Sequence, residues 1–440
     1  MEDMADRDKI LVTGISFSPV APVAARFKMS CMSRTRVLAL ALTLSLLFWL
    51  GRGDARAAEP VVETVTESET TTSASATGDH VQSLFPFLIS LGVHAGYDSN
   101  SQTTSNSQGS AFASEELTVS YDRTHGATQI GLVAGLAVIE RFSRNTDVNA
   151  LLNLTASHQI SPRLSLSGSI DSAYRAEPDF SSDVGPNQRA GNYFRSSEQI
   201  AATYRWTDRF STVTSYSFRL IRYENSTTAF FTDRNEHTIG EEFRFDLSRQ
   251  TVLLADYRFL VVDYDSVPRD STTHFLLAGV EQTFSRRLTA QLRAGASLRS
   301  FDEGEDSTDP NVEGSASYAL GRDSSLTWNI RYGVEEPGIQ EAMSRETFRT
   351  GLQFAYRFTP KISSAATFYY HHDENTTGGV GVTSGTAFTT DAFDLLLVGR
   401  YQITRHLDLD ISYGHSEVSS GGTGSNYSRN RYAIGMTFTF

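Results

Sequence analysis

The amino-acid sequence predicts an all-β fold: a transmembrane antiparallel β-barrel of the outer-membrane type, with about 18 strands and a range of about 16 to 18. Three observations predict it. Segments of about 10 to 15 residues alternate apolar with polar side chains, as strands do when their two faces meet different environments. Short turns alternate with long polar loops between these segments. The chain ends in such a segment, and its last residue, Phe440, is aromatic.

The composition agrees with this fold and excludes a bundle of membrane-spanning helices. Hydrophobic residues make up 39% of the 440 residues, and no run of about 20 apolar residues follows the amino-terminal region. Aromatic residues are abundant, with 27 Phe and 18 Tyr. The formal net charge of −13 disfavours nucleic acid as a partner.

The amino-terminal region has the pattern of a secretory signal peptide. An apolar run at 37–50 follows Arg34 and Arg36 and precedes a small-x-small site that ends at Ala57. We expect residues 1–57 to be an amino-terminal extension with the signal peptide at about 29–57. A short membrane anchor is the alternative, although about 14 residues are too few to span a bilayer comfortably. Cys31, the one cysteine of the chain, lies in this region, so the mature protein would have no disulfide.

Residues 58–84 are rich in Glu, Thr, Ser and Ala and show little apolar periodicity. Such a segment buries too little surface to fold alone, so we expect a disordered periplasmic lead-in. A plug for the barrel is the alternative.

The barrel is expected to span residues 85–440. In its first segment Ile89, Leu91 and Val93 alternate with Ser90 and Gly92, and later segments repeat the pattern. Short turns are expected at 161–163 and 359–361, for example, and long loops at 178–192 and 304–310. A secreted sandwich or propeller is the alternative fold, but its strands would usually be shorter.

The last segment places apolar and aromatic residues on one face, as the closing strand of an outer-membrane barrel requires. These residues also resemble the carboxyl-terminal signal by which such barrels are recognised for assembly: Tyr432, Ile434, Met436, Phe438 and Phe440.

Several features together resemble one family. They are the export signal, the acidic lead-in, a first strand that ends in Gly96-Tyr97-Asp98-Ser99-Asn100, the hairpin rhythm, and the terminal Phe438-Thr439-Phe440. The chain resembles the putative β-barrel porin 2 family over about 85–440. The resemblance implies a channel-like role, and some relatives are associated with exopolysaccharide production. It supplies no catalytic residue.

Two stretches were considered for chemistry. His415 and Ser416 could belong to a lipid-acting hydrolase, but adjacent strand residues point to opposite faces. The run 371–374 offers four potential ligands in a row, but consecutive strand residues diverge, whereas a metal site needs convergent groups. We therefore expect no enzyme activity, no metal and no other cofactor.

If the apolar faces look outward, the charged residues of the strands look into the lumen, where they either pair across strands or line a water-filled passage. The predicted pore-lining residues are Arg205, Arg244, Asp246, Asp256, Arg258, Arg293, Arg299, Arg331, Glu335, Arg357, Asp408 and Asp410.

The sequence therefore predicts a porin-like channel in the bacterial outer membrane, for small polar solutes or a polysaccharide chain. A surface-interaction barrel with a closed lumen is the alternative, and a lipid-acting hydrolase comes last. The expected partners are outer-membrane lipid and lipopolysaccharide, the barrel assembly machinery, and the solute or polysaccharide cargo.

Overall fold

The structure is a computed structural model that describes residues 87–142, 146–181, 189, 191–224, 232–265, 267–302, 306–338, 342–376, 387–421 and 426–440. The predicted signal peptide at 1–57 and the predicted lead-in at 58–84 lie outside these residues. No helix in the described ranges is long and apolar enough to cross a membrane.

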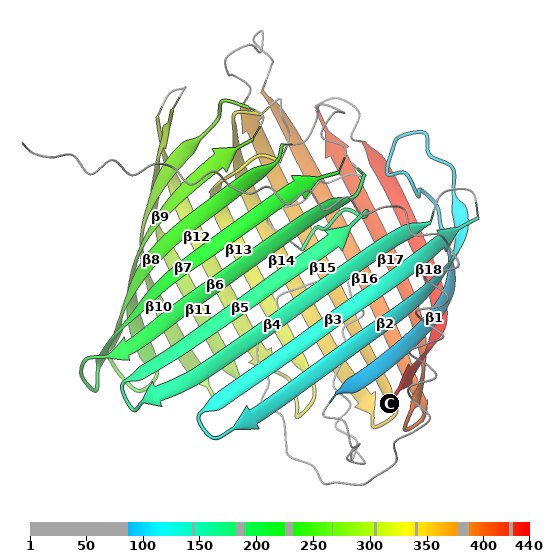
Figure 1. The fold of residues 1–440 in the computed structure, drawn as a ribbon, viewed down its shortest axis with the longest axis horizontal. Helices are drawn as coiled ribbons and strands as arrows, with labels where there is room; N and C mark the ends of the chain where they lie inside the picture. The colour runs from blue at the N-terminus through cyan, green and yellow to red at the C-terminus, as the bar shows by residue number, and fades with distance from the viewer. Residues whose placement is uncertain are drawn as a thin grey trace, which may run out of the picture. The chain divides into compact units, whose positions relative to one another are not determined.

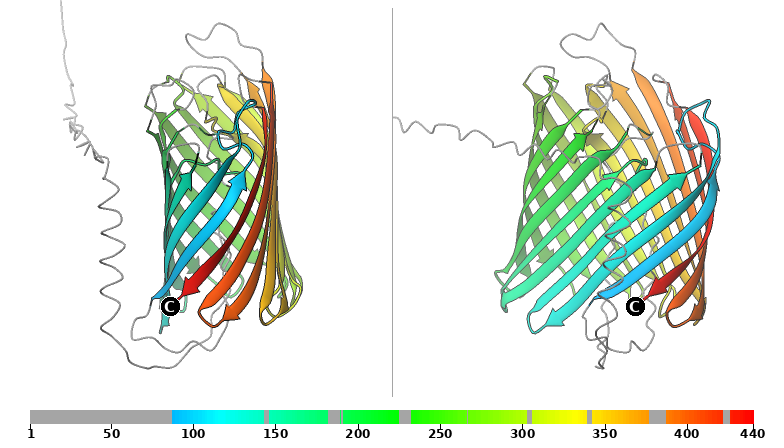
Figure 2. Two further views of the ribbon diagram at one scale, coloured as in Figure 1. Left: turned by 90° about the vertical axis from the view of Figure 1, so that its right-hand side faces the viewer. Right: turned by 45° about the vertical axis from the view of Figure 1, so that its right-hand side comes forward.

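The described residues form one closed antiparallel barrel of 18 strands (Figures 1 and 2). Each strand pairs with the next in sequence, and β1 closes the ring on β18. This confirms the predicted fold class and strand count. The strands are β1 Leu88–Asp98, β2 Ser110–His125, β3 Thr128–Arg141, β4 Asp147–Ser161, β5 Leu164–Arg175, β6 Tyr193–Arg205, β7 Phe210–Tyr223, β8 Arg234–Asp246, β9 Thr251–Tyr264, β10 Ser271–Ser285, β11 Leu288–Phe301, β12 Ser307–Ala319, β13 Ser325–Glu335, β14 Ser344–Thr359, β15 Ile362–Thr376, β16 Phe388–Thr404, β17 Leu407–Ser420 and β18 Tyr427–Thr439.

The two ends of the barrel differ. Short connections such as 162–163 and 360–361 join strands at one end, which we call the turn end, and the carboxyl terminus lies there (Figure 1). The longer connections lie at the other end, the loop end. In outer-membrane barrels the short turns face the periplasm and the long loops face outward.

One predicted loop is too long. Residues 304–310 were expected to form a polar loop. In the structure β12 begins at Ser307, and Pro310 lies within the strand opposite Ala296. Asp309 and Asn311 lie on the inner face and Pro310 lies on the outer face, so the alternation of the strand continues through the proline.

The faces of the strands are assigned by contacts that only one side of a curved sheet permits. Arg258 of β9 bonds Glu313 of β12, which is not a neighbouring strand. Side chains converge in this way only on the concave face. By contrast, Tyr432, Ile434, Met436, Phe438 and Phe440 are exposed on the outer face. Their role as an assembly signal stays a prediction.

The pairing of β1 with β18, which closes the barrel, depends on a glycine at a close contact. Gly435 pairs with His94 across the seam, and a Cβ at Gly435 would overlap the His94 ring and the Val93 carbonyl oxygen. The His94 ring lies 3.9 Å from both Glu116 of β2 and Asp410 of β17. It therefore occupies the inner face of the seam, over a residue that must lack a side chain.

We expect Gly435→Val to lower the free energy of unfolding by about 1–3 kcal/mol or more, because overpacking a tight contact forces the backbone apart. The measurement is the urea midpoint of the folded barrel, followed by its migration on unboiled gels. The matched control is Gly414→Val, since the nearest atom to a Cβ at Gly414 is 3.9 Å away. Equal midpoints for the two variants would show that the seam is not tight.

Candidate functional site in the barrel lumen

The middle of the inner wall carries a network of paired charges on β8 to β12, which we call the β8–β12 charge network. Arg258 donates to Glu313 at 2.9 Å and to Asp256 at 2.9 Å. Arg293 bonds Glu242 on β8 and lies 3.6 Å from Asp256. These contacts bring together Arg258, Arg293 and Asp256, which the sequence proposed separately.

A neighbouring group on β13 to β15 centres on Glu335. Arg345 and Arg349 donate to Glu335 at 3.0 and 3.1 Å, and Arg331 lies 3.4 Å from it. Asp373 of β15 adds a second carboxylate, 3.7 Å from Arg345. Like charges on directly opposite residues are destabilising, so the pairing of Arg331 with Arg349 requires these carboxylates nearby.

The remaining predicted residues also lie on the inner face but at other places. Asp410 accepts from Arg400 at 2.8 Å, and Asp408 lies 4.0 Å from Arg400. Arg357 donates to Asp323 at 3.0 Å near the turn end. Arg299 is buried against Glu336. Arg205, Arg244 and Asp246 line a recess of about 370 Å³ at the turn end. All twelve predicted residues share the inner face, and that they line a solute path stays a prediction.

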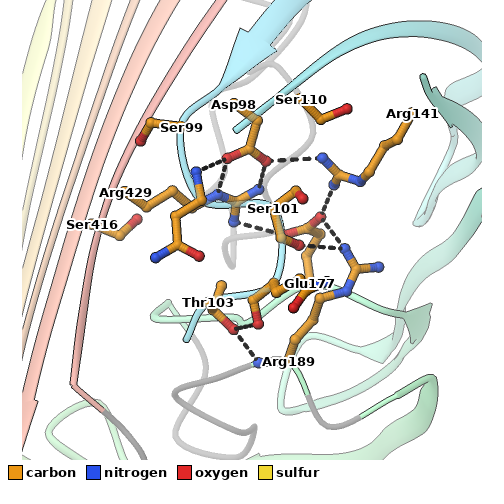
Figure 3. Close-up of polar contacts among 12 residues, drawn as sticks. Asp98, Ser99, Ser101, Thr103, Ser110, Arg141, Glu177, Arg189, Ser416 and Arg429 are labelled. Carbon is orange, nitrogen blue, oxygen red and sulfur yellow. Dashed lines mark hydrogen bonds and ion pairs between the residues drawn. The ribbon is translucent and has the colours of Figure 1, made fainter. Parts of the chain in front are cut away.

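The segment 176–181, which follows β5, folds into the lumen, and Glu177 anchors it (Figure 3). The Glu177 carboxylate accepts from Arg429 at 2.7 Å and from Arg189 at 3.1 Å, and it also pairs with Arg141. Asp98 accepts from the same Arg429 and Arg141, at 2.7 and 2.9 Å. The segment is thereby tied to β1, β3 and β18.

The carboxylates of this segment are charged at neutral pH. Burial alone would raise the pKa of Glu177, but Arg429, Arg189 and Arg141 outweigh it and hold that pKa well below its usual range. The pKa of Asp179 is also lowered, because Arg175 and neighbouring groups outweigh its burial. Both side chains therefore act as permanent negative anchors under ordinary conditions.

Phe180 extends the segment along the inner wall to β16, β17 and β18. Its ring packs with Ala392 of β16, Val418 of β17 and Tyr427 of β18, and its centroid lies 6.1 Å from that of His371 on β15. In the ring of strands β5 is far from β16. The segment therefore lies over the inner face of several strands and narrows the lumen.

A cavity of about 410 Å³ lies between the end of this segment and the wall formed by β11 to β15. Phe180 and Ser181 line one side. Consecutive strands place one row of residues in register on the other side: Arg293, Glu313, Arg331, Arg349 and His371. The narrowed lumen is thus bounded by a charged wall and by an aromatic side chain.

A second inward segment follows β13. The Glu336 carboxylate accepts from Tyr264 of β9 at 2.7 Å, and the Pro337 carbonyl accepts from Arg269 at 3.1 Å. Arg269 also bonds the Ala342 carbonyl and donates to Thr232. Segment 336–338 therefore rests on the inner wall at the loop end, near β8 to β11.

The stretches considered for chemistry do not form catalytic arrangements. His415 bonds Asn430 at 3.0 Å on the outer face, whereas Ser416 donates to Asp394 at 2.5 Å on the inner face. His371 is buried inside, while His372 bonds Asp391 outside. Within the described ranges, no group of three or more His, Cys, Asp or Glu side chains is placed to hold a metal ion.

Sequence reasoning missed Glu177, Phe180, Glu242, Glu313 and Arg349. For Glu242, Glu313 and Arg349 the sequence did contain a signal. Each lies at an inward position of an alternating strand, and that strand or an adjacent one carries a predicted residue. Glu177 lies just before the predicted loop 178–192 and Phe180 lies within it, in a stretch that shows no apolar periodicity. Only the phenylalanine within a polar loop hinted at an inward role.

Several solved structures are similar to this chain at low sequence identity. OpdQ from Pseudomonas aeruginosa is 10% identical, with a TM-score of 0.43 over 81% of this chain and 99% of that chain. OccAB4 from Acinetobacter baumannii is 10% identical, with a TM-score of 0.41 over 81% and 99%. The siderophore receptor PirA from Pseudomonas aeruginosa is 12% identical, with a TM-score of 0.39 over 82% of each chain. No curated protein matches the chain.

The sequence was compared with models of known protein families. The model of the family described as putative beta-barrel porin 2 matches residues 76–440. The protein is a porin-like β-barrel of the outer membrane, and it belongs to the putative beta-barrel porin 2 family.

Proposed function

We propose that the protein is an outer-membrane channel for small polar solutes and that segment 176–181 forms its constriction. The observation that carries this proposal is the cavity of about 410 Å³ between Phe180 and the charged wall. Charged and polar side chains replace part of the hydration of a polar solute, and their arrangement selects what passes. An 18-stranded barrel is wide enough to leave an aqueous lumen once its side chains are in place.

Of the two cargoes that the sequence suggested, the geometry favours small solutes over a polysaccharide chain. A chain that threads the barrel would have to displace Glu177 from Arg429 and Phe180 from the wall. Such ion pairs, once buried, are costly to break because they leave uncompensated charges. The separation of His415 from Ser416 on opposite faces gives no support to a hydrolase.

Charge reversal tests the proposal. We expect Arg293→Glu and Arg331→Glu to shift the zero-current potential toward cation selectivity in a salt gradient, because both positions face the constricted cavity. The control is Arg287→Glu, in the turn between β10 and β11. Folding of each variant is checked on unboiled gels. If the potential of the two lumen variants equals that of the control, these arginines do not line the conducting path.

A further inference from the structure

The outer face of β6 to β10 carries a group of polar side chains among apolar ones. We call it the β6–β10 outer patch and define it by residues that share this face in register: Glu198, Thr214, Tyr216, His237, Glu241, Tyr257 and His274. The most exposed apolar side chains between them are Ile200, Ile239 and Leu276.

The two carboxylates of this patch lie at the middle of their strands. On the outer face of β8, His237 and Ile239 lie between Glu241 and the loop end, and Phe243 and Phe245 lie between it and the turn end. Glu346 and Glu374 also point outward, but they lie beside the loop ends of β14 and β15, whereas Glu115 lies within β2 and outside the patch. Glu241 therefore lies at the depth of the lipid chains rather than of the headgroups.

Contacts within the chain satisfy these groups only in part. Thr214 donates to one oxygen of Glu241 at 2.6 Å. The Tyr216 hydroxyl lies 2.9 Å from Nδ1 of His237, and the Tyr257 hydroxyl lies 2.9 Å from Nδ1 of His274. Among the described residues, no hydrogen bond reaches the second oxygen of Glu241 or the Nε2 atom of either histidine. In lipid such groups are costly, because nothing there can bond them.

The unsatisfied groups include both acceptors and donors, since the carboxylates accept and each Nε2 can donate when a tyrosine occupies Nδ1. A two-fold related copy would present the same carboxylates and imidazoles to this face, as an isologous interface requires. We propose that the β6–β10 outer patch is the surface on which a second copy of this chain docks in the membrane. This inference does not depend on the proposed channel function.

Cysteine cross-linking in outer membranes tests the interface, in the full chain carrying Cys31→Ser. Ile239→Cys places a thiol in the patch, and Leu397→Cys places one on β16, across the barrel. Both side chains are exposed on the outer face, so they form a matched pair. We expect Ile239→Cys to give a covalent dimer of this chain, with a yield roughly tenfold above that of Leu397→Cys.

A second change tests the role of the carboxylates. Adding Glu198→Leu and Glu241→Leu to the Ile239→Cys chain should reduce the dimer to the yield of Leu397→Cys. These substitutions suit a lipid-facing surface, so the barrel still folds, whereas adding Glu374→Leu should change nothing. Equal yields at the two cysteine positions, a cross-link to a different protein, or a dimer that survives the double substitution would each overturn the proposal.

Discussion

Phe180→Ala is expected to raise the single-channel conductance several-fold. The Phe180 ring holds the end of segment 176–181 against Ala392, Val418 and Tyr427. Truncating a buried phenylalanine to alanine costs about 3–5 kcal/mol in protein cores, and the contact here is the apolar attachment of the segment to that wall. Without it we expect the segment to move away from β16 to β18 and the lumen to widen beside the cavity that Phe180 lines. Planar-bilayer recordings of the purified barrel measure the change.

The control for this variant is Phe142→Ala, because Phe142 is 79% exposed beside the loop end of β3. It removes the same ring without touching the lumen. An unchanged conductance in Phe180→Ala, with the barrel folded by its gel migration, would mean that the segment does not limit the current.

Acid is expected to release the same segment. Glu177 and Asp179 have pKa values in the folded state below their usual range, so their stabilising contribution is complete above the ordinary carboxylate pKa of about 4. It is lost as the pH falls through the lowered pKa values. We therefore expect a conductance that is constant between about pH 7 and 5 and that rises steeply below about pH 4.

Glu177→Gln separates this effect from general acid damage. A glutamine cannot take up the proton, and it removes the negative charge that Arg141, Arg189 and Arg429 face wherever Glu177 is ionised. The variant should conduct more than the wild type at pH 7 and show a smaller acid response. A wild-type response that is retained in full would assign the acid effect to other groups.

Most of the barrel could be predicted from the sequence because the direction of each strand side chain follows from the local alternation of apolar and polar residues. Alternation in β1 and β18 determines which residues face lipid, and the same parity places Arg258, Arg293 and Arg331 on the inner face. The strand alternation also continues through 307–310, which were expected to belong to a loop, so that boundary was wrong.

The inward position of segment 176–181 could not be predicted because its contacts are not local. Glu177 and Arg429 are separated by 252 residues, and segment 176–181 has no period that shows which way its side chains point. Its position follows from closure of the ring, which brings β18 beside β1 and both within reach of the end of β5. The charge pairs could not be predicted for the same reason. Arg258 and Glu313 lie on strands that are not neighbours, and they meet only because the sheet is curved.

The decisive measurement is the single-channel conductance of the wild-type protein, purified from outer membranes and inserted into planar bilayers. An aqueous path past Phe180 predicts discrete current steps that persist and that increase with salt concentration. A barrel that is folded, as shown by altered migration on boiling, but that gives no steps would contradict an open lumen. Segments 176–181 and 336–338 would then close the barrel rather than narrow it.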